Sequence, residues 1–161
     1  MLDTPEITQT KLHHTAVVHL TIPRAQIGSA MGPAMDEVTA TIAAQGVAPE
    51  GPFFSHHLRL DPQTFDFEVG VPVSEPVAPT GRVTASILPA ATVARVVYHG
   101  PQEELGTAWQ EFDAWITDHG HTPAADLWEV YHSGPEAHAD PAQWRTELIR
   151  PLIRVAQEPA L

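Results

Sequence analysis

A carboxylate in the middle of an aromatic strand is the first feature of this chain that could do chemistry. The run Leu-Trp-Glu-Val-Tyr around Glu129 is bulky, apolar and aromatic, which is typical of a β-strand. Successive side chains of a strand point to opposite faces, so Glu129 would share a face with Leu127 and Tyr131. Trp128 and Val130 would point into the core. Glu129 is then either an ordinary solvated residue or the negative group of an aromatic-lined pocket, suited to a cation or to proton transfer.

The other motifs give no support for a metal or a cofactor. The chain has ten histidines but no cysteine. Histidines cluster at residues 13–14, 56–57 and 119–121, but none of these clusters has the helical spacing or the neighbouring carboxylates of a metalloenzyme motif. The sequence also lacks a phosphate-binding glycine loop and a Gly-x-Ser-x-Gly elbow. We therefore expect neither a metal nor a cofactor.

The composition indicates a single domain with an acidic surface. The 161 residues are 43% hydrophobic, enough for one core, and 20 acidic against 8 basic residues give a formal charge of −12. This charge repels nucleic-acid phosphates, so direct nucleic-acid binding is not expected, whereas cationic small molecules or a basic protein partner are favoured. No apolar run reaches membrane-spanning length, and residues 1–11 lack a signal-peptide pattern, so we expect a cytoplasmic protein without membrane contact.

Hydrophobic periodicity divides the first half of the chain into a strand, a helix and two further strands. Apolar residues from Ile27 to Ile42 recur every three or four positions, which predicts a helix with Gly46 as its C-terminal cap. Pro33 should kink or restart this helix, because proline removes a backbone donor. Strands are expected over residues 14–22, 51–60 and 65–73.

The second half repeats this order of elements after a proline-containing linker at residues 74–80. Gly100-Pro101 starts a helix that Gly120 ends. The apolar stripe of this helix is Leu105, Trp109, Phe112 and Ile116. Strands are expected over residues 83–88, 92–99, 127–131 and 146–153.

The two halves also match each other in sequence, which indicates a duplication. A shift of 78 positions superposes Ala16 on Ala94 and Gly28 on Gly106. A shift of 74 positions superposes the two helix-ending glycines, and it also places Ser55 on Glu129 and His57 on Tyr131.

The predicted duplication places a groove where the two halves meet. Two units side by side, each with its helix on one face of the sheet, would leave the opposite faces free to form a concave groove about a pseudo-two-fold axis. Such a junction is a common place for a small-molecule site. Phe53 would belong either to the groove wall or to the core. The residues expected to face the groove are Phe53, Ser55, His57, Leu127, Glu129 and Tyr131.

Five segments in this order resemble the GyrI-like effector-binding domain, the ligand-sensing domain of many AraC-type and MerR-type multidrug regulators. The resemblance runs from about residue 12 to 153. It rests on Gly51-Pro52-Phe53-Phe54, residues 65–73, Gly106-Thr107-Ala108-Trp109, Trp128-Glu129-Val130-Tyr131 and Thr146-Glu147-Leu148.

The resemblance implies an α+β fold of two β-α-β-β units that form one antiparallel sheet, with the helices on one face and a central groove. Family members bind bulky, often cationic and aromatic drugs there, with the glutamate equivalent to Glu129 at the base of the groove. Some stand-alone members are similar to enzymes that hydrolyse cyclopropane-bearing electrophiles. The chain departs from the family in two ways. The helix-turn-helix of the regulators is not found in it, and His57 stands where tyrosine is common, which implies a pocket that is more polar, smaller or pH-sensitive.

Several other side chains are weaker candidates. Glu68 belongs either to a solvated strand face or, paired with Glu129, to a hydrolytic site. Trp109 is expected in the core, whereas Trp115 would reach a groove edge. Tyr98 and Trp144 are further lining candidates.

Three functions follow from these observations. The first is a stand-alone module that binds an amphipathic, cationic or aromatic small molecule through Glu129, Tyr131 and Phe53. The second is a hydrolase with Glu129 as general acid/base, and the third is a gyrase-inhibitor-like module for a basic protein partner. The predicted organisation is a lead-in over residues 1–11, one domain over 12–154 with repeats over about 12–75 and 81–154, and a tail over 155–161.

Overall fold

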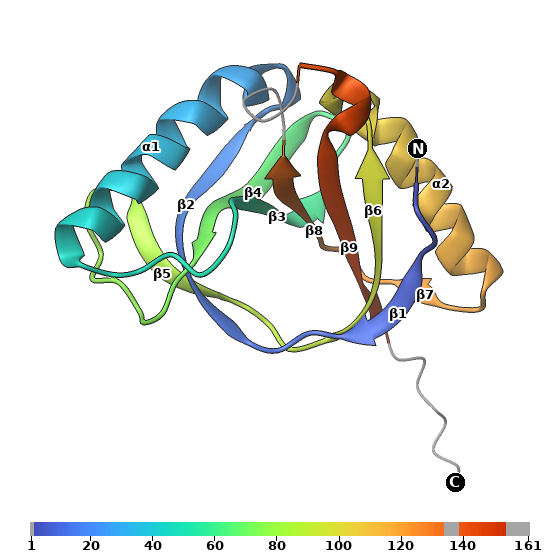
Figure 1. Ribbon diagram of the computed structural model, residues 1–161, viewed down its shortest axis with the longest axis horizontal. Coiled ribbons are helices and arrows are strands. Elements are labelled where there is room, and N and C mark those ends of the chain that lie inside the picture. Colours follow the sequence, from blue (N-terminus) through green and yellow to red (C-terminus); the bar gives the residue numbers. More distant parts are fainter. Residues whose placement is uncertain (1, 134–138, 154–161) are drawn as a thin grey trace, which may run out of the picture.

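The computed structural model describes residues 2–133 and 139–153. Within these residues a mainly antiparallel sheet carries two long helices (Figure 1). Short 3₁₀ turns cover Arg24–Gln26, Gln102–Glu104 and Pro141–Gln143. The elements in chain order are β1 (Glu6–Gln9), β2 (His13–Pro23), α1 (Ile27–Gln45), β3 (Phe54–Leu60), β4 (Thr64–Pro72), β5 (Val83–Leu88), β6 (Thr92–His99), α2 (Leu105–Asp118), β7 (Thr122–Pro123), β8 (Leu127–Ser133) and β9 (Arg145–Ile153).

The strand order is symmetric about the middle of the sheet. Neighbouring strands follow the path β1-β6-β9-β8-β3-β4-β2-β5, and β7 pairs with β9 beside this path. At the centre, β3 and β8 run antiparallel, with Ser55 directly opposite Glu129 and His57 opposite Leu127. Ser55 and Glu129 are also the pair that the shift of 74 positions superposes, so the pseudo-two-fold axis passes beside them. The predicted fold class, a duplicated α+β unit with one antiparallel sheet, is confirmed.

The outermost strands are exchanged between the two halves. β1, at the start of the first half, pairs with β6 of the second, and β5, at the start of the second half, pairs with β2 of the first. The segments that follow them meet, because Thr10 N–H donates to Ala91 O at 2.8 Å and the Thr10 hydroxyl donates to Pro89 O at 3.0 Å. Part of the expected lead-in, Glu6–Gln9, therefore forms a strand of the sheet.

The two helices lie on the same face of the sheet and each builds its own core. α1 packs on β2 and β4 through a cluster that includes Ala34 and Val38 of the helix. α2 packs on the second half through Phe112 and Ile116, which are fully buried as the predicted stripe requires. The helices diverge over the two ends of the sheet (Figure 1).

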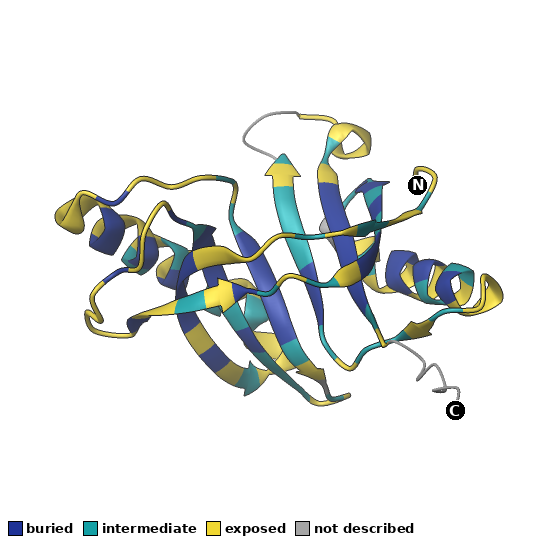
Figure 2. Ribbon diagram, turned by 90° about the horizontal axis from the view of Figure 1, so that it is seen from below, coloured by how far each residue is buried: buried dark blue, intermediate teal, exposed yellow. Residues whose placement is uncertain are grey.

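The opposite face of the sheet is closed by a third apolar cluster. Figure 2 views the molecule from this side. Trp128 and Val130 contribute to this cluster, which confirms their predicted direction. Leu88, the last residue of β5, belongs to it, and Ala91, between β5 and β6, packs against it. Its buried members are Val17, Phe54, Leu88, Val93, Trp128 and Ile149.

In the first half, glycine has its usual effect on the helix and proline does not. α1 ends as predicted at Gly46, whose φ of 68° is the left-handed conformation that glycine adopts without strain. Pro33, however, does not interrupt α1, which continues as one helix from Ile27 to Gln45. Packing of the buried face of α1 on the sheet outweighs the single backbone hydrogen bond that proline removes.

Candidate functional site

A cavity of about 500 Å³ lies between the two helices and is lined by residues of both helices and of the central strands. It is therefore on the helix-bearing face, and the prediction of a groove on the opposite face is wrong. The reason is the third apolar cluster, which fills the opposite face. The lining residues are Arg24, Ile27, Gly28, Met31, Met35, His57, Phe65, Leu105, Gly106, Trp109, Glu129 and Tyr131.

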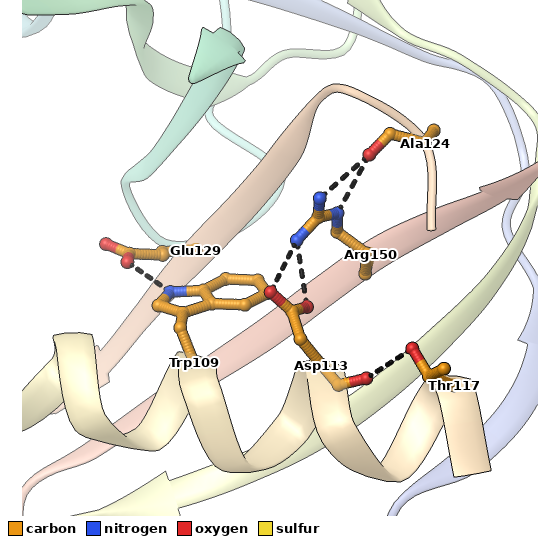
Figure 3. A network of polar contacts seen from close by, with 6 residues as sticks. All are labelled: Trp109, Asp113, Thr117, Ala124, Glu129 and Arg150. Atoms are coloured by element: carbon orange, nitrogen blue, oxygen red, sulfur yellow. Dashed lines mark hydrogen bonds and ion pairs between the residues drawn. The ribbon is translucent and has the colours of Figure 1, made fainter. Parts of the chain in front are cut away.

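Glu129 is held by two hydrogen-bond donors, one on each carboxylate oxygen. Trp109 Nε1 of α2 donates to Oε2 at 2.7 Å, which Figure 3 shows, and the Tyr131 hydroxyl donates to Oε1 at 2.8 Å. Such donors stabilise the ionised carboxylate and fix its orientation. The carboxylate thus faces the cavity with its geometry already set.

A hydrogen-bonded chain links Glu129 to His57 across the centre of the sheet. Ser55 Oγ lies 2.6 Å from the Tyr131 hydroxyl oxygen and 3.1 Å from His57 Nε2. Because the Tyr131 proton is committed to Glu129, the Ser55 hydroxyl donates to Tyr131 and accepts from His57 Nε2–H. The chain of donors therefore runs in one direction and ends on the carboxylate.

The protein environment shifts the pKa values of the groups in this chain. Burial raises the pKa of Glu129, while the hydrogen bonds from Trp109 and Tyr131 lower it in part. Burial and the neighbouring Glu129 raise the pKa of Tyr131, so its hydroxyl keeps its proton. Burial, together with nearby His56 and Arg24, lowers the pKa of His57 to about 4, so this imidazole is neutral at pH 7.

A buried arginine fixes the helix that carries Trp109. Arg150 of β9 donates through Nη1 to both carboxylate oxygens of Asp113, at 2.8 and 3.1 Å. Its Nε and Nη2 donate to Ala124 O at 3.0 and 2.9 Å (Figure 3). Asp113 lies one helical turn after Trp109, so the ion pair holds the indole in register with Glu129.

The walls of the cavity are mostly apolar. α1 contributes Ile27, Met31 and Met35, and α2 contributes Leu105. Methionine side chains are flexible and polarizable, and so adapt to ligands of different shape. Gly28 and Gly106, which the shift of 78 positions superposes, both line the cavity and have nothing within 4 Å of the position of a Cβ atom. Side chains are thus missing at matching places on the two helices, which leaves room between them.

The structure brings together some of the predicted site residues and separates others. Glu129, Tyr131 and His57 line the cavity, and Ser55, fully buried, connects them. Leu127 is buried in the α2 core.

Three further candidates pack elsewhere. Phe53 packs against the α1 core, and Trp115 packs on the α2 core and stacks on His119, with ring centroids 4.1 Å apart. The Tyr98 hydroxyl donates to Pro101 O at 2.9 Å. Neither they nor Trp144, which follows the 3₁₀ turn at Pro141–Gln143, line the cavity.

Glu68 lies on the other face of the sheet. In the ladders it stands opposite His56, which stands opposite Trp128, so it shares the face of the third apolar cluster. Its Oε1 accepts from the Ser86 hydroxyl at 2.8 Å. Glu68 therefore cannot pair with Glu129 on a molecule held in this cavity.

Sequence reasoning missed several lining residues. Trp109 is predicted in the core, and its ring does pack there. The sequence gives no indication that its indole nitrogen also donates to Glu129. Arg24, Met31 and Met35 gave no signal, because only the closeness of α1 to α2 brings them to the same cavity as Glu129. Phe65 lines that cavity from β4, two strands away from Glu129.

Two kinds of site receive no support from the part of the chain that the structure describes. No group of three or more histidine or acidic side chains there is placed to hold a metal ion. No helix within residues 2–133 and 139–153 is long and apolar enough to cross a membrane.

Comparison with known proteins gives a family for this fold. The sequence model of the GyrI-like small molecule binding domain matches residues 4–153, whereas no curated protein matches the chain. The solved C-terminal domain of EcmrR is 19% identical, with a TM-score of 0.80 over 94% of this chain and 98% of that one. In the EcmrR–DNA complex the identity is 20% and the TM-score 0.80 over 94% of this chain, which spans only 58% of the EcmrR chain in that structure.

Two more distant structures share the fold. A hydrolase encoded by lin2189 from Listeria innocua is 14% identical, with a TM-score of 0.67 over 92% of this chain and 91% of that one. SAV2435, solved with tetraphenylphosphonium bound, is 10% identical, with a TM-score of 0.61 over 94% of each chain. The match over residues 4–153, together with this shared fold, shows that the chain belongs to the family of GyrI-like small-molecule-binding domains.

Proposed function

We propose that the cavity between α1 and α2 binds an amphipathic aromatic molecule whose positive charge faces Glu129. The observation that carries this proposal is the position of Glu129, the single carboxylate among the lining residues of a mostly apolar cavity. Two donors orient it, and aromatic rings of Trp109, Tyr131 and Phe65 share the same walls.

The electrostatics of Glu129 favour a cationic partner. Burial raises its pKa, which means that the ionised carboxylate is poorly solvated. A ligand cation within about 4–6 Å would supply the missing stabilisation and lower that pKa. Aromatic faces near a cation add about 0.5–2 kcal/mol. A lipophilic cation thus gains from both the charge and the walls.

Hydrolysis of an electrophilic small molecule is the second candidate function, favoured by the same raised pKa. A carboxyl group that titrates closer to neutral pH is better suited to act as general acid and base. Glu68, the predicted assisting carboxylate, is on the other face of the sheet, so Glu129 would have to act alone.

The test compares the affinity of tetraphenylphosphonium with that of uncharged triphenylphosphine oxide for the wild type and for Glu129→Gln. Loss of charged contacts should weaken cation binding by about tenfold or more, and leave the neutral compound unaffected. Glu68→Gln, which removes a carboxylate outside the cavity, is the matched control and should bind both as the wild type does. Unchanged cation affinity in Glu129→Gln would contradict the proposal.

The two candidates are separated by mass spectrometry of the recovered compounds. Cyclopropane-bearing electrophiles should be included in the same panel. A compound returned unaltered supports binding. A compound returned with water added by the wild type, and unaltered by Glu129→Gln, would make hydrolysis the function.

A further inference from the structure

The cavity carries two opposite charges and not one. Among its lining residues, Glu129 is the acid and Arg24 the base. His57 adds no charge at neutral pH, because its pKa is lowered to about 4. The formal charge of the lining is therefore zero, although the whole chain carries −12.

The two charges stand at different ends of the cavity. Glu129 is on β8, whereas Arg24 precedes α1 and its guanidinium lies over the ring of Phe65 on β4. In the ladders Glu129 stands opposite Ser55, which stands opposite Val69, and Phe65 lies four residues further along β4. Glu129 and Phe65 are therefore about 10 Å apart across the strands and about 13 Å apart along them. Because Glu129 and Arg24 both line the one cavity, an extended aromatic molecule that fills it can contact both groups.

Arg24 is held in place but keeps free donors. Its Nε donates to Asp61 O at 2.7 Å, and its guanidinium carbon lies 4.4 Å from the centroid of Phe65. Neither Nη atom has a hydrogen-bond or ion-pair partner within residues 2–133 and 139–153. Arg59 and Arg82, in contrast, are paired with Asp66 and Glu37. A guanidinium fixed by stacking and one hydrogen bond, with Nη groups available, is suited to bind a carboxylate.

We propose that the ligand is amphoteric: an aromatic molecule with a cationic group at Glu129 and a carboxylate at Arg24. The inference rests on the proposed function and narrows its ligand class. A simple lipophilic cation would pair with Glu129, but the positive charge of Arg24 at the other end of the cavity would stay unpaired and would repel it. A molecule with both charges complements both ends, so Arg24 is a specificity-determining residue.

The size of the preference is limited by solvent. Arg24 is exposed, and exposed ion pairs contribute less than buried ones. A charged hydrogen bond at the edge of a cavity nevertheless accounts for roughly a tenfold change in affinity. That is large enough to measure with a matched pair of ligands.

The matched pair is an unsubstituted rhodamine as its free acid, a zwitterion, and the methyl ester of the same dye, a cation. Fluorescence anisotropy gives both dissociation constants for the wild type. We expect the free acid to bind about tenfold more tightly than the ester. In Arg24→Gln the two constants should become equal, while the ester binds at least as tightly as to the wild type. Arg24→Lys, which keeps the charge but not the stacked fork, should retain part of the preference.

Arg59→Gln is the control, because this arginine is exposed and paired with Asp66 outside the cavity lining. It should keep the wild-type ratio. Equal binding of the two dyes by the wild type, or a ratio that survives in Arg24→Gln, would overturn the inference. If the ester still binds and depends on Glu129, only the amphoteric ligand class fails. If neither dye binds the wild type, the proposed function fails with it.

Discussion

The indole nitrogen of Trp109 donates a 2.7 Å hydrogen bond to Oε2 of Glu129, so a helix residue that packs in the core also sets the position of the cavity carboxylate. Core and site share one side chain here. Packing of α2 on the sheet and the orientation of the acidic group are therefore linked.

Trp109→Phe is expected to weaken cation binding without emptying the core. The substitution keeps an aromatic ring but removes a donor that lowers the pKa of Glu129, so this pKa should rise further. Cation affinity should fall by roughly tenfold. As the pH is lowered, Glu129 of the variant should become protonated, and cation binding should be lost, at a higher pH than in the wild type. Calorimetric titration with tetraphenylphosphonium at several pH values measures both effects. Trp115→Phe, a ring outside the cavity lining, should change neither.

Arg150→Gln is expected to lower the free energy of unfolding by about 2–3 kcal/mol. Arg150 is only 6% exposed, and it donates to both Asp113 and Ala124 O. Arg82→Gln provides the comparison, since its ion pair with Glu37 is solvent-exposed and should contribute much less to stability. Urea denaturation of the two variants gives the difference. If the two variants lose equal amounts of unfolding free energy, the buried contacts of Arg150 stabilise the protein no more than an exposed ion pair does.

Stability should decrease as the pH falls from 6.5 towards 4 because of His57. Its pKa is about 4 in the folded protein, against the ordinary histidine value of 6.5, so the unfolded chain binds more protons in this range. The loss reaches about 3 kcal/mol at the lower end. Denaturation at pH 7 and pH 5 should show a smaller difference for His57→Gln than for the wild type. Identical pH dependence in both would exclude His57 as a contributor.

Gly70→Ala is expected to be strongly destabilising. A Cβ atom at Gly70 would lie 1.9 Å from the backbone oxygen of Ala16, so β2 and β4 would have to separate where they pair. Gly106→Ala in α2 is the matched control, because its Cβ atom meets nothing within 4 Å and alanine favours the helix by about 0.5–1 kcal/mol. Thermal melts should move in opposite directions for the two variants. A wild-type melting temperature for Gly70→Ala would contradict the packing described for this strand pair.

The sequence predicts the elements of this fold well, because their signals are local. The strand at Thr92–His99 and the glycine that ends α1 follow from alternation and from backbone preference. The duplication was visible because equivalent residues keep their spacing, and Ser55 and Glu129 indeed face each other. A restart of the helix at Pro33 is the part of this prediction that is wrong, because tertiary packing outweighs a local penalty and α1 continues through Pro33.

The site was harder to predict, because it depends on how distant elements meet. Alternation along the strand predicts which residues share a face of the sheet with Glu129. It does not predict which face of the sheet carries the cavity. That depends on the segments that pack Leu88 and Ala91 onto the opposite face. Arg24 and Met35 reach the cavity only because two helices, far apart in sequence, lie on the same side of the sheet.

The exchange of β1 and β5 has the form of a domain-swapped dimer whose two subunits have been joined into one chain. Each half on its own would project its first strand away from its own sheet and leave its own outer edge uncovered. Two copies of such a half would cover each other, as the two halves do here. Joining them also let the centre become asymmetric, since one position could become Ser55 and its counterpart Glu129, which no dimer of identical chains can do.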